Sequence, residues 1–553
     1  MKLIKLLILL FSTFIMAQEV PMLKVGDSLS LNLSHLNIKT EITGNVAVTS
    51  YLMKFYNETQ QTLEGELSFP LSQGQSVTNF AMDANGKMRS AVIVEKELGR
   101  VAYESTVRQT IDPGLLELTK GNNYKARVYP ILPKNYKTIE IIFEEELNIR
   151  EGNHIYNLPL SFQEPLGFNF EISIYNSELK PNILKGKKYE IDFKTSDFKI
   201  SSKVKKENII ADEPFSLEIP VASSQVVSTY SSYFNVYKAF EHKSKLKTKP
   251  NSINIFWDTS LSMNYRDIDE EFKLLNDYFK YLQNVEVKLV AFSNTIISKE
   301  QFTINNGNWK QLKKYLESLN YDGGTSYLQL PKSNADEILF FSDGMFNLGG
   351  FNEIKNTNIY CINGLNSANH EFLQNLSQQN NGKYINLKRL STKQALNELK
   401  TESYKFLGYK TNNNIEEIYP KKGAVVDLGF SLSGRFTKNT ELELLFGYDN
   451  EVDKSVTVKL TANNFNSLPK RLWAKKKLQY LSLEKEDNKD EIIELAKKYH
   501  LISDYTSLIV LDRIEDYLRY KIEPPIELKA EYKERVASAE SEDEIRKENL
   551  LQR

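Results

Sequence analysis

The sequence predicts a multidomain protein in which β-rich modules flank one α/β domain with a doubly wound sheet, followed by a largely helical C-terminal part. Length is the first reason, because 553 residues correspond to several domains of roughly 150 residues each. Patterning is the second reason. Apolar and polar residues alternate with the period of a strand over much of the chain, but from Ile253 onward nearly continuous apolar strands alternate with amphipathic helices.

The composition is that of a folded protein without a strong net charge. Hydrophobic residues make up 41% and aromatic residues 11% of the chain, which argues against disorder over most of its length. Lys and Arg number 71 against 72 Asp and Glu, so no net field attracts nucleic acid or an anionic membrane, and we expect no nucleic-acid partner. Cys361 is the only cysteine, which excludes an intrachain disulfide.

Residues 1–17 have the pattern of a signal peptide. Lys2 and Lys5 precede an apolar run from Leu6 to Met16, and the small residue Ala17 offers a cleavage point. The run is shorter than the roughly 20 residues of a membrane-spanning helix, so an uncleaved anchor is the second interpretation. We therefore expect an exported protein, located in the periplasm, on the outer surface or secreted, and the Lys-, Asn- and Ile-rich body suggests a bacterium.

Residues 18–150 are predicted to form a β-rich domain. From Thr62 to Phe69, and again from Ile139 to Phe143, apolar and polar residues alternate as in half-buried strands. Between them, Val94 to Tyr103 has helical spacing, and Asp112-Pro113-Gly114 supplies a turn that ends the helix. One helix is thus expected among the strands.

Several short motifs follow one another in this region. They are Phe69-Pro70-Leu71, Glu95-Lys96, Tyr103-Glu104, Asp112-Pro113-Gly114-Leu115-Leu116-Glu117 and Arg127-Val128-Tyr129-Pro130-Ile131. This ordered series resembles the vault/inter-alpha-trypsin (VIT) domain. The motifs contain no clustered nucleophile, base or ligand set, so we expect their residues to shape turns and fill a core.

Residues 151–244 are predicted to form a second β module. From Phe168 to Ile174, apolar residues alternate with polar ones. The polar and basic stretch from Glu241 to Ser252 is typical of a linker at a domain boundary, and its lysines are expected to be solvated.

The α/β domain is predicted over residues 251–401. Its strands are expected at Ile253 to Trp257, Val285 to Phe292, Glu337 to Ser342, Asn358 to Ile362 and Lys383 to Asn386, and its helices at Ile268 to Leu282, Trp309 to Leu319 and Glu371 to Leu376. Apolar strands that alternate with helices indicate a parallel sheet covered on both faces, which is a doubly wound, Rossmann-like arrangement.

Strand patterns return after residue 401 and then give way to helices. A β module is predicted over residues 402–466, helices plus one strand (Ser507 to Leu511) over residues 467–525, and a charged tail over residues 526–553. Because β patterns lie on both sides of the α/β domain, we expect them to form one sandwich into which that domain is inserted.

Hydroxyl and carboxyl side chains follow three segments of the α/β domain. Asp258, Ser260 and Ser262 come directly after its first strand, Thr325 lies in a glycine-bearing loop, and Asp343 follows another apolar strand. The carboxyl ends of strands form the crevice in which doubly wound sheets bind ligands. Hard oxygen ligands suit Mg²⁺, which is our first expectation, or Mn²⁺ or Ca²⁺. The alternative is that the serines cap a helix and the last aspartate caps a turn, without a metal.

These three segments, in this order and strand context, resemble the metal ion-dependent adhesion site of the von Willebrand factor type A domain. The resemblance implies that the hydroxyls of Ser260, Ser262 and Thr325 bind the metal, while Asp258 and Asp343 act through water or directly. Trp257, before the first aspartate, is bulkier than the aliphatic residue usual in the family, so this strand end is unusual.

The charge of such a site favours adhesion. Neutral hydroxyls on the metal, with carboxylates mostly behind water, leave the cation with positive charge and an open position for a partner's carboxylate. We therefore expect a metal-dependent protein-binding or adhesion protein that captures a Glu or Asp side chain of an envelope or extracellular-matrix protein, without a small-molecule substrate. The alternative is a structural module of a cell-envelope assembly whose metal is incidental.

An enzyme is the least favoured interpretation. Metal-assisted hydrolysis needs a base or an activated water, normally with a Glu or His in reach. The histidines lie in no catalytic motif, and no G-x-S-x-G, H-E-x-x-H or G-x-x-x-x-G-K-[ST] occurs. The histidines are His35, His154, His242, His370 and His500.

The order of the two recognised regions is similar to that in the heavy chains of inter-alpha-trypsin inhibitor. Leu472 to Leu478, Ala496 to Ser503 and Tyr505 to Leu511 also resemble the segment that follows the A-type domain in those chains. The Asp-Pro-His signal through which the animal heavy chains attach to hyaluronan is missing, so the resemblance does not imply glycan transfer.

Overall fold

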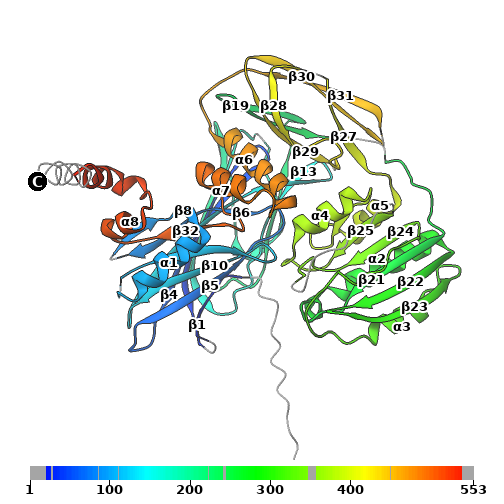
Figure 1. The fold of residues 1–553 in the computed structure, drawn as a ribbon, viewed down its shortest axis with the longest axis horizontal. Helices are drawn as coiled ribbons and strands as arrows, with labels where there is room; N and C mark the ends of the chain where they lie inside the picture. The colour runs from blue at the N-terminus through cyan, green and yellow to red at the C-terminus, as the bar shows by residue number, and fades with distance from the viewer. Residues whose placement is uncertain are drawn as a thin grey trace, which may run out of the picture.

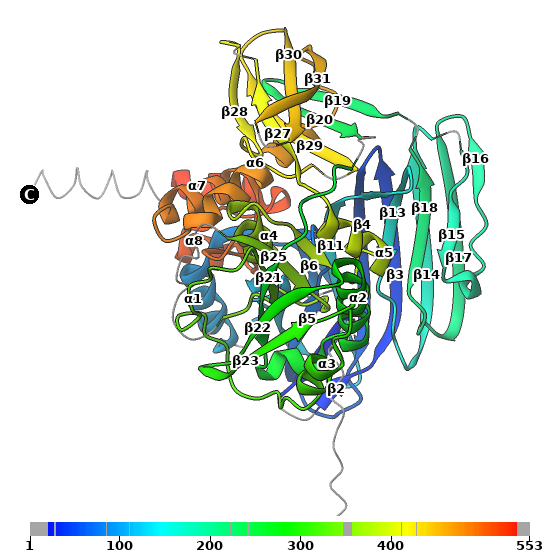
Figure 2. The same ribbon diagram turned by 90° about the vertical axis from the view of Figure 1, so that its right-hand side faces the viewer.

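The computed structural model describes residues 20–538, apart from short gaps at 27–28, 85, 110, 178, 222, 241–243, 347–356, 411, 427 and 449. The predicted signal peptide (residues 1–17) lies outside the described residues, as does the end of the predicted charged tail, from residue 539. Within the described ranges, none of the helices is both long and apolar enough to cross a membrane. The chain is multidomain and rich in strands (Figure 1, Figure 2).

The N-terminal module contains two large sheets that share one core. The first has the strand order β2 (Leu29–Leu31), β1 (Met22–Val25), β5 (Leu63–Pro70), β10 (Asn123–Ile131), β9 (Gly114–Thr119), β32 (Thr506–Val510) and β8 (Val92–Glu95). The second has the order β16 (Lys194–Ser196), β17 (Lys199–Ile210), β14 (Pro165–Tyr175), β3 (Leu33–Thr43), β4 (Val46–Tyr56), β11 (Tyr136–Glu146), β6 (Ser76–Ala84) and β7 (Lys87–Ser90). Leu67 of β5 and Ile141 of β11 both lie fully buried in the shared core.

Alternation along the strands explains why one face of each sheet is buried. In β4, nearly every second side chain is buried, as the period of two in a strand requires. The strands predicted from Thr62 to Phe69 and from Ile139 to Phe143 are β5 and part of β11, and the predicted helix is α1 (Lys96–Val107).

Residues 148–220 belong to this same module. β14 pairs in parallel with β3, and its Phe170 enters the shared core. A small sheet with the order β12 (Asn148–Arg150), β13 (Asn153–Leu158), β18 (Phe215–Pro220) and β15 (Asn182–Lys185) adds Tyr156 and Leu217 to that core. We expected one β module over residues 151–244, whereas the strand pairing divides this stretch, because alternation shows which face of a strand is buried but not which strand lies beside it.

Strand β32 returns to the first sheet, where it lies beside β8 (Figure 1) and pairs with β9 on its other edge. It is antiparallel to both neighbours, with Leu508 opposite Leu116 on one side and Ile93 on the other. All of its side chains are buried, as expected of a strand with neighbours on both edges and packing on both faces. The sequence predicts this strand at Ser507 to Leu511 but not its partners.

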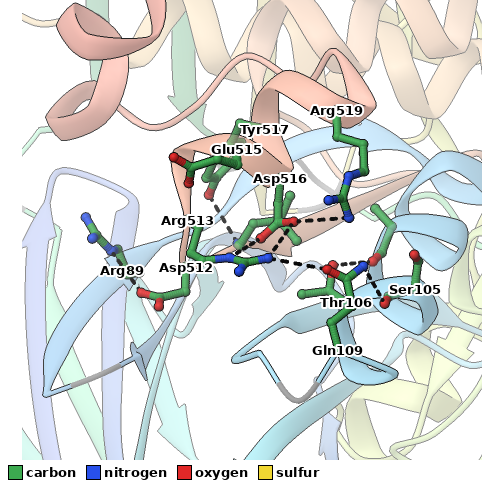
Figure 3. Close-up of polar contacts among 12 residues, drawn as sticks. Arg89, Ser105, Thr106, Gln109, Asp512, Arg513, Glu515, Asp516, Tyr517 and Arg519 are labelled. Carbon is green, nitrogen blue, oxygen red and sulfur yellow. Dashed lines mark hydrogen bonds and ion pairs between the residues drawn. The ribbon is translucent and has the colours of Figure 1, made fainter.

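The turn after β32 is tied to the end of helix α1. Asp516, near the start of α8 (Ile514–Tyr520), is fully buried and accepts a hydrogen bond from Arg513 at 3.1 Å, while Arg519 lies 3.7 Å away. Arg513 also donates to Gln109, just beyond α1, at 3.4 Å (Figure 3). Two guanidinium groups thus compensate one buried carboxylate, and Arg513 also joins this turn to the segment that follows α1.

The α/β domain contains one six-stranded sheet. Its strands have the order β23 (Ile296–Ile304), β22 (Val285–Phe292), β21 (Ser252–Asp258), β24 (Glu337–Phe341), β25 (Asn358–Asn363) and β26 (Tyr384–Asn386). Neighbours are parallel except for β23, which is antiparallel to β22. The sequence predicts the parallel strands but not β23, whose mostly exposed side chains carry no apolar pattern.

Helices cover both faces of this sheet. On one face lie α2 (Ile268–Leu282), α3 (Lys310–Glu317) and α5 (Thr392–Lys400), and on the other lies α4 (His370–Gln379). Consecutive side chains of β21 point to opposite faces of the sheet. Ile255 and Trp257 pack in the core with α2, α3 and α5, and Phe256 packs in the core with α4. The predicted helices correspond to α2, α3 and part of α4, whereas α5 is additional.

A β sandwich surrounds the α/β domain in the sequence. One sheet joins β19 (Gln225–Tyr230) and β20 (Tyr233–Ala239) to β29 (Gly429–Phe436) and β28 (Ile415–Tyr419), and the other contains β27 (Tyr404–Tyr409), β30 (Thr440–Tyr448) and β31 (Glu451–Leu460). Phe234, Leu432 and Phe446 share its core. The expected insertion of the α/β domain into a sandwich is confirmed. Of the strands of this sandwich, only β19 and β20 precede the α/β domain in the sequence.

Helices α6 (Leu468–Leu481) and α7 (Lys489–Tyr499) connect the sandwich to β32. On the sandwich side, Trp473 of α6 donates to the carbonyl of Glu417 at 3.0 Å. On the side of the N-terminal module, Arg471 pairs with the buried Glu144. Helix α6 therefore bridges two modules.

Shortening Ile509, which is fully buried in β32, is expected to weaken the N-terminal module. An Ile→Ala change in a core costs about 2–5 kcal/mol of unfolding free energy, so in Ile509→Ala the amides of β9 should exchange faster with solvent deuterium. Hydrogen exchange followed by mass spectrometry checks this. Leu444→Ala, at an equally buried site in the sandwich, is the control and should leave β9 unchanged; unaltered β9 exchange in Ile509→Ala would contradict the pairing.

Candidate metal centre

Asp258 is the last residue of β21 and is fully buried. Its Oδ2 accepts a hydrogen bond from the Ser342 hydroxyl at 2.6 Å, and its Oδ1 accepts one from the backbone N–H of Ser260 at 2.9 Å. Because β21 is a central strand, its end opens onto the carboxyl edge where loops from neighbouring strands meet. The carboxylate is thereby held in one orientation at that edge.

Backbone hydrogen bonds join the loop that carries Thr325 to the loop after β21. The N–H of Asp322 donates to the carbonyl of Thr259 at 2.9 Å, and the N–H of Leu261 donates to the carbonyl of Gly323 at 3.0 Å. The structure thus brings these two predicted segments into direct contact, and the hydrogen bond from Ser342 to Asp258 joins the third segment to them.

The predicted hydroxyl ligands differ in exposure. Ser260 and Thr325 are buried, whereas Ser262 is half-buried. The Oγ atoms of Ser260 and Ser262 lie 3.3 Å apart. Ser260 precedes the 3-10 helix Leu261–Tyr265, but its side chain makes no capping hydrogen bond, so helix capping does not account for this serine.

Asp343 is fully buried, two residues beyond the end of β24. Its Oδ1 accepts a hydrogen bond from the N–H of Met345 at 2.8 Å, as in a capped turn. Its Oδ2 has no hydrogen-bond partner in the part of the chain that the structure describes. A buried carboxylate oxygen in this state is unfavourable unless a proton or a cation compensates it.

Burial is the main reason why the pKa of both carboxyl groups is raised. For Asp258, burial raises the pKa, and hydrogen bonds from Ser342 and Ser260 oppose the rise. For Asp343, burial and then the charge of Asp258 raise the pKa to about 7, and the nearby Ser262 hydroxyl opposes the rise. Two buried carboxyl groups that repel each other form an environment that a cation stabilises.

The donor atoms fit a hard cation. The five predicted ligands offer only oxygen, from two carboxylates and three hydroxyls, which suits Mg²⁺, Mn²⁺ or Ca²⁺. Among the residues that the structure describes, no group of three or more His, Cys, Asp or Glu side chains is placed to hold a metal. A site of this kind therefore depends on its hydroxyls.

Arg266 lies behind the site and was not predicted. It is buried, donates to the carbonyl of Asp258 at 2.9 Å and to Glu271 at 2.6 Å, and its guanidinium carbon lies 4.0 Å from the centre of the Trp257 ring. The unusual bulk of Trp257 thus provides the surface on which the arginine stacks. Ser342, which orients Asp258, was also missed, and its place beside a predicted ligand was the only signal for it.

Comparison with known families identifies the N-terminal region. Residues 33–143 match the family model of the vault protein inter-alpha-trypsin domain. The chain therefore contains a VIT domain. The match runs from β3 to the middle of β11, whereas the core around the VIT domain also takes in β14, β17, β18 and β32.

The relatives of this VIT-containing chain include proteins with A domains. Inter-alpha-trypsin inhibitor heavy chain H3 of Homo sapiens is 20% identical over 86% of this chain and 62% of its own length. A von Willebrand factor A domain-containing protein of Dictyostelium discoideum is 21% identical over 88% of this chain and 59% of its own length. The chain thus spans about three fifths of each of these relatives. Its predicted resemblance to both groups is confirmed.

Solved structures add little to this comparison. The crystal structure of the ArnB paralog VWA2 from Sulfolobus acidocaldarius is 15% identical, covers 56% of this chain and 93% of its own, and has a TM-score of 0.26. The α/β domain is defined by its own strand order and registers.

The raised pKa of Asp343 predicts how the metal-free protein responds to pH. An ordinary Asp has a pKa of 3.8, whereas folded Asp343 has a pKa of about 7, so the folded state retains this proton to higher pH than the unfolded state does. The protonated Asp343 carboxyl group contributes its full stabilisation of the folded state below pH 3.8. This contribution is lost as the pH rises through about 7. In chelator, the unfolding temperature should fall over this range, and Asp343→Asn should flatten the fall.

Thermal unfolding monitored by circular dichroism at a series of pH values measures this effect. Asp197→Asn, at an exposed turn of the N-terminal module, is the control and should keep the native profile. Identical profiles for the native protein and Asp343→Asn would contradict the role of this carboxyl group.

Proposed function

We propose that this protein binds a partner protein through a divalent cation held by Asp258, Ser260, Ser262, Thr325 and Asp343. The observation that carries the proposal is the buried Oδ2 of Asp343, which has no hydrogen-bond partner among the described residues although the charge of Asp258 acts on the same carboxyl group. A cation satisfies this oxygen and offsets the repulsion. Mg²⁺ is the first choice for an all-oxygen site, with Mn²⁺ or Ca²⁺ as alternatives.

The balance of hydroxyls and carboxylates supports adhesion. Asp258 already accepts hydrogen bonds from the protein. The other oxygen atoms offered to a cation therefore come mostly from neutral hydroxyls. A bound cation supplies a positive charge that a Glu or Asp side chain of a partner can ligate. Ser262 is half-buried and its neighbour Leu261 is exposed, which gives a partner access.

The relatives support a role in protein interaction in general, since their names describe an inhibitor chain and A-domain proteins. The metal, the acidic ligand and the site of action are our proposals. We propose an exported protein that acts in the periplasm, at the outer surface or after secretion, on an envelope or matrix protein.

A structural module of an envelope assembly is the second candidate. A metal-dependent hydrolase has less support, because it needs a base. His370 is buried, hydrogen-bonded to Tyr384 at 2.6 Å and to the carbonyl of Asn366 at 2.9 Å, and burial lowers its pKa to about 4. It is thus engaged within the fold.

Calorimetry with Mg²⁺ and Mn²⁺ on the full chain tests the metal site. The native protein is expected to bind, and Asp343→Asn should lower the affinity at least ~10-fold, because it removes a charge while keeping the shape of the side chain. Asp197→Asn should bind like the native protein. Absence of binding to the native chain would refute the site.

Capture of envelope proteins on the immobilised chain, with and without chelator, tests adhesion. Retention of a partner should require the metal, should be lost in Asp343→Asn, and should be competed by peptides that contain Glu but not by the same peptides with Gln. If the partner is retained equally with and without chelator and with and without the Glu peptide, the structural module is favoured.

A further inference from the structure

The β9–β10 turn of the VIT domain (residues 119–123) touches the loop that carries Asp343 (residues 342–346). Lys120 donates a hydrogen bond from its Nζ to the carbonyl of Phe346 at 3.0 Å. The carboxyl edge of the α/β sheet, where the candidate metal centre lies, is therefore in contact with the neighbouring domain.

Gly121 lies where this contact leaves no room for a side chain. Its φ is +76°, and a Cβ at this position would lie 2.6 Å from the Met345 sulfur and 2.8 Å from the Ser367 Oγ. Atoms do not pack this closely, so a larger residue has to displace its neighbours. Beside it, Asn123 donates to the Ser367 hydroxyl at 2.7 Å.

Met345 is itself bonded to a candidate ligand. Its N–H donates to Oδ1 of Asp343 at 2.8 Å. On the other side, the carbonyl of Asp343 accepts a hydrogen bond from the N–H of Asn369, the N-cap of α4, at 2.7 Å. Asp343 is thus held between a helix of its own domain and a residue that rests on the VIT turn, so a shift of Met345 is transmitted to the carboxylate.

The β9–β10 turn is braced within the VIT domain. The Asn122 side-chain amide donates to three carbonyls at 3.3, 2.9 and 3.0 Å, those of Leu71, Ser72 and Gln75. This ties it to the β5–β6 turn, where Gln73 accepts a hydrogen bond from Asn386 of the α/β domain at 3.0 Å. Two connected turns therefore support the edge of the sheet.

We propose that Lys120, Gly121 and Asn123 of the VIT domain are positioning residues of the metal site, which hold the Asp343 loop in the geometry that binds the cation. The inference rests on the proposed function as far as the cation is concerned. The positioning itself concerns only residues of this chain and can be measured without metal. On this basis, the VIT domain sets the affinity of the site in its neighbour.

Gly121→Asn tests the contact, with Gly86→Asn as its matched control. Asn tolerates positive φ better than other side chains do, and Gly86 has a φ of +77° with nothing within 4 Å of a Cβ. Calorimetry with Mn²⁺ on the full chain is expected to show at least ~5-fold weaker binding for Gly121→Asn, the lower end of typical coupling between sites, and native affinity for Gly86→Asn. Equal affinities in the two variants would overturn the coupling.

Hydrogen exchange of the metal-free protein separates this inference from the proposed function. The peptide that covers residues 342–346 should exchange faster in Gly121→Asn than in Gly86→Asn, because the hydrogen bond from Met345 to Asp343 is loosened. If the native chain binds no Mn²⁺ but this difference remains, the metal function fails and the positioning stands. If residues 342–346 exchange at the same rate in the two variants, the positioning role is overturned, whether or not the native chain binds Mn²⁺.

A second variant keeps the test independent of backbone strain. Lys120→Met removes the hydrogen bond to Phe346 from an exposed side chain and leaves the glycine in place. It is expected to speed exchange of residues 342–346 while leaving β5 and β10 protected. Exchange equal to that of the native protein in both Lys120→Met and Gly121→Asn would show that the VIT turn does not hold the loop.

Discussion

The pairing of β32 with β8 and β9 is the interaction on which the rest of the structure depends. Because the last strand completes the first sheet, the sandwich and the α/β domain lie in an insertion whose two ends both return to the N-terminal module. The sandwich is closed in the same way around the α/β domain, through the pairing of β20 with β29. Each inserted unit is therefore fixed at both ends, which removes most of the freedom of a domain on a single linker.

Helix α6 adds a second constraint at the place where the modules meet. Arg471 pairs with the buried Glu144, and Lys475 donates to the carbonyl of Gly74 at 3.1 Å. Gly74 belongs to the same β5–β6 turn whose Gln73 contacts the α/β domain. The β5–β6 turn of the VIT domain therefore contacts helix α6 through Gly74 and the α/β domain through Gln73. Buried charges in such a junction are strongly destabilising when one partner is lost, so the junction favours one arrangement of the modules.

Those residues of the candidate site that directly follow a strand could be predicted from the sequence. A carboxylate or hydroxyl directly after a buried parallel strand has to emerge at the carboxyl edge of the sheet, which is why Asp258 and Asp343 could be named from the sequence. Arg266 and Ser342 could not, because their roles depend on contacts that no local pattern records. The same holds for Gly121, which looks like an ordinary turn glycine until Met345 is seen against it.

The sequence by itself determined the type and place of most strands and helices, the insertion of the α/β domain and the oxygen-rich character of the candidate metal centre. These properties follow from periodicity and side-chain chemistry, which are local. Only the tertiary structure decided that residues 148–220 join the VIT core, that β32 lies between β8 and β9, and that the VIT turn rests on the Asp343 loop. Periodicity shows that a face is buried without naming what covers it, so contacts between distant segments are determined only when the whole chain packs.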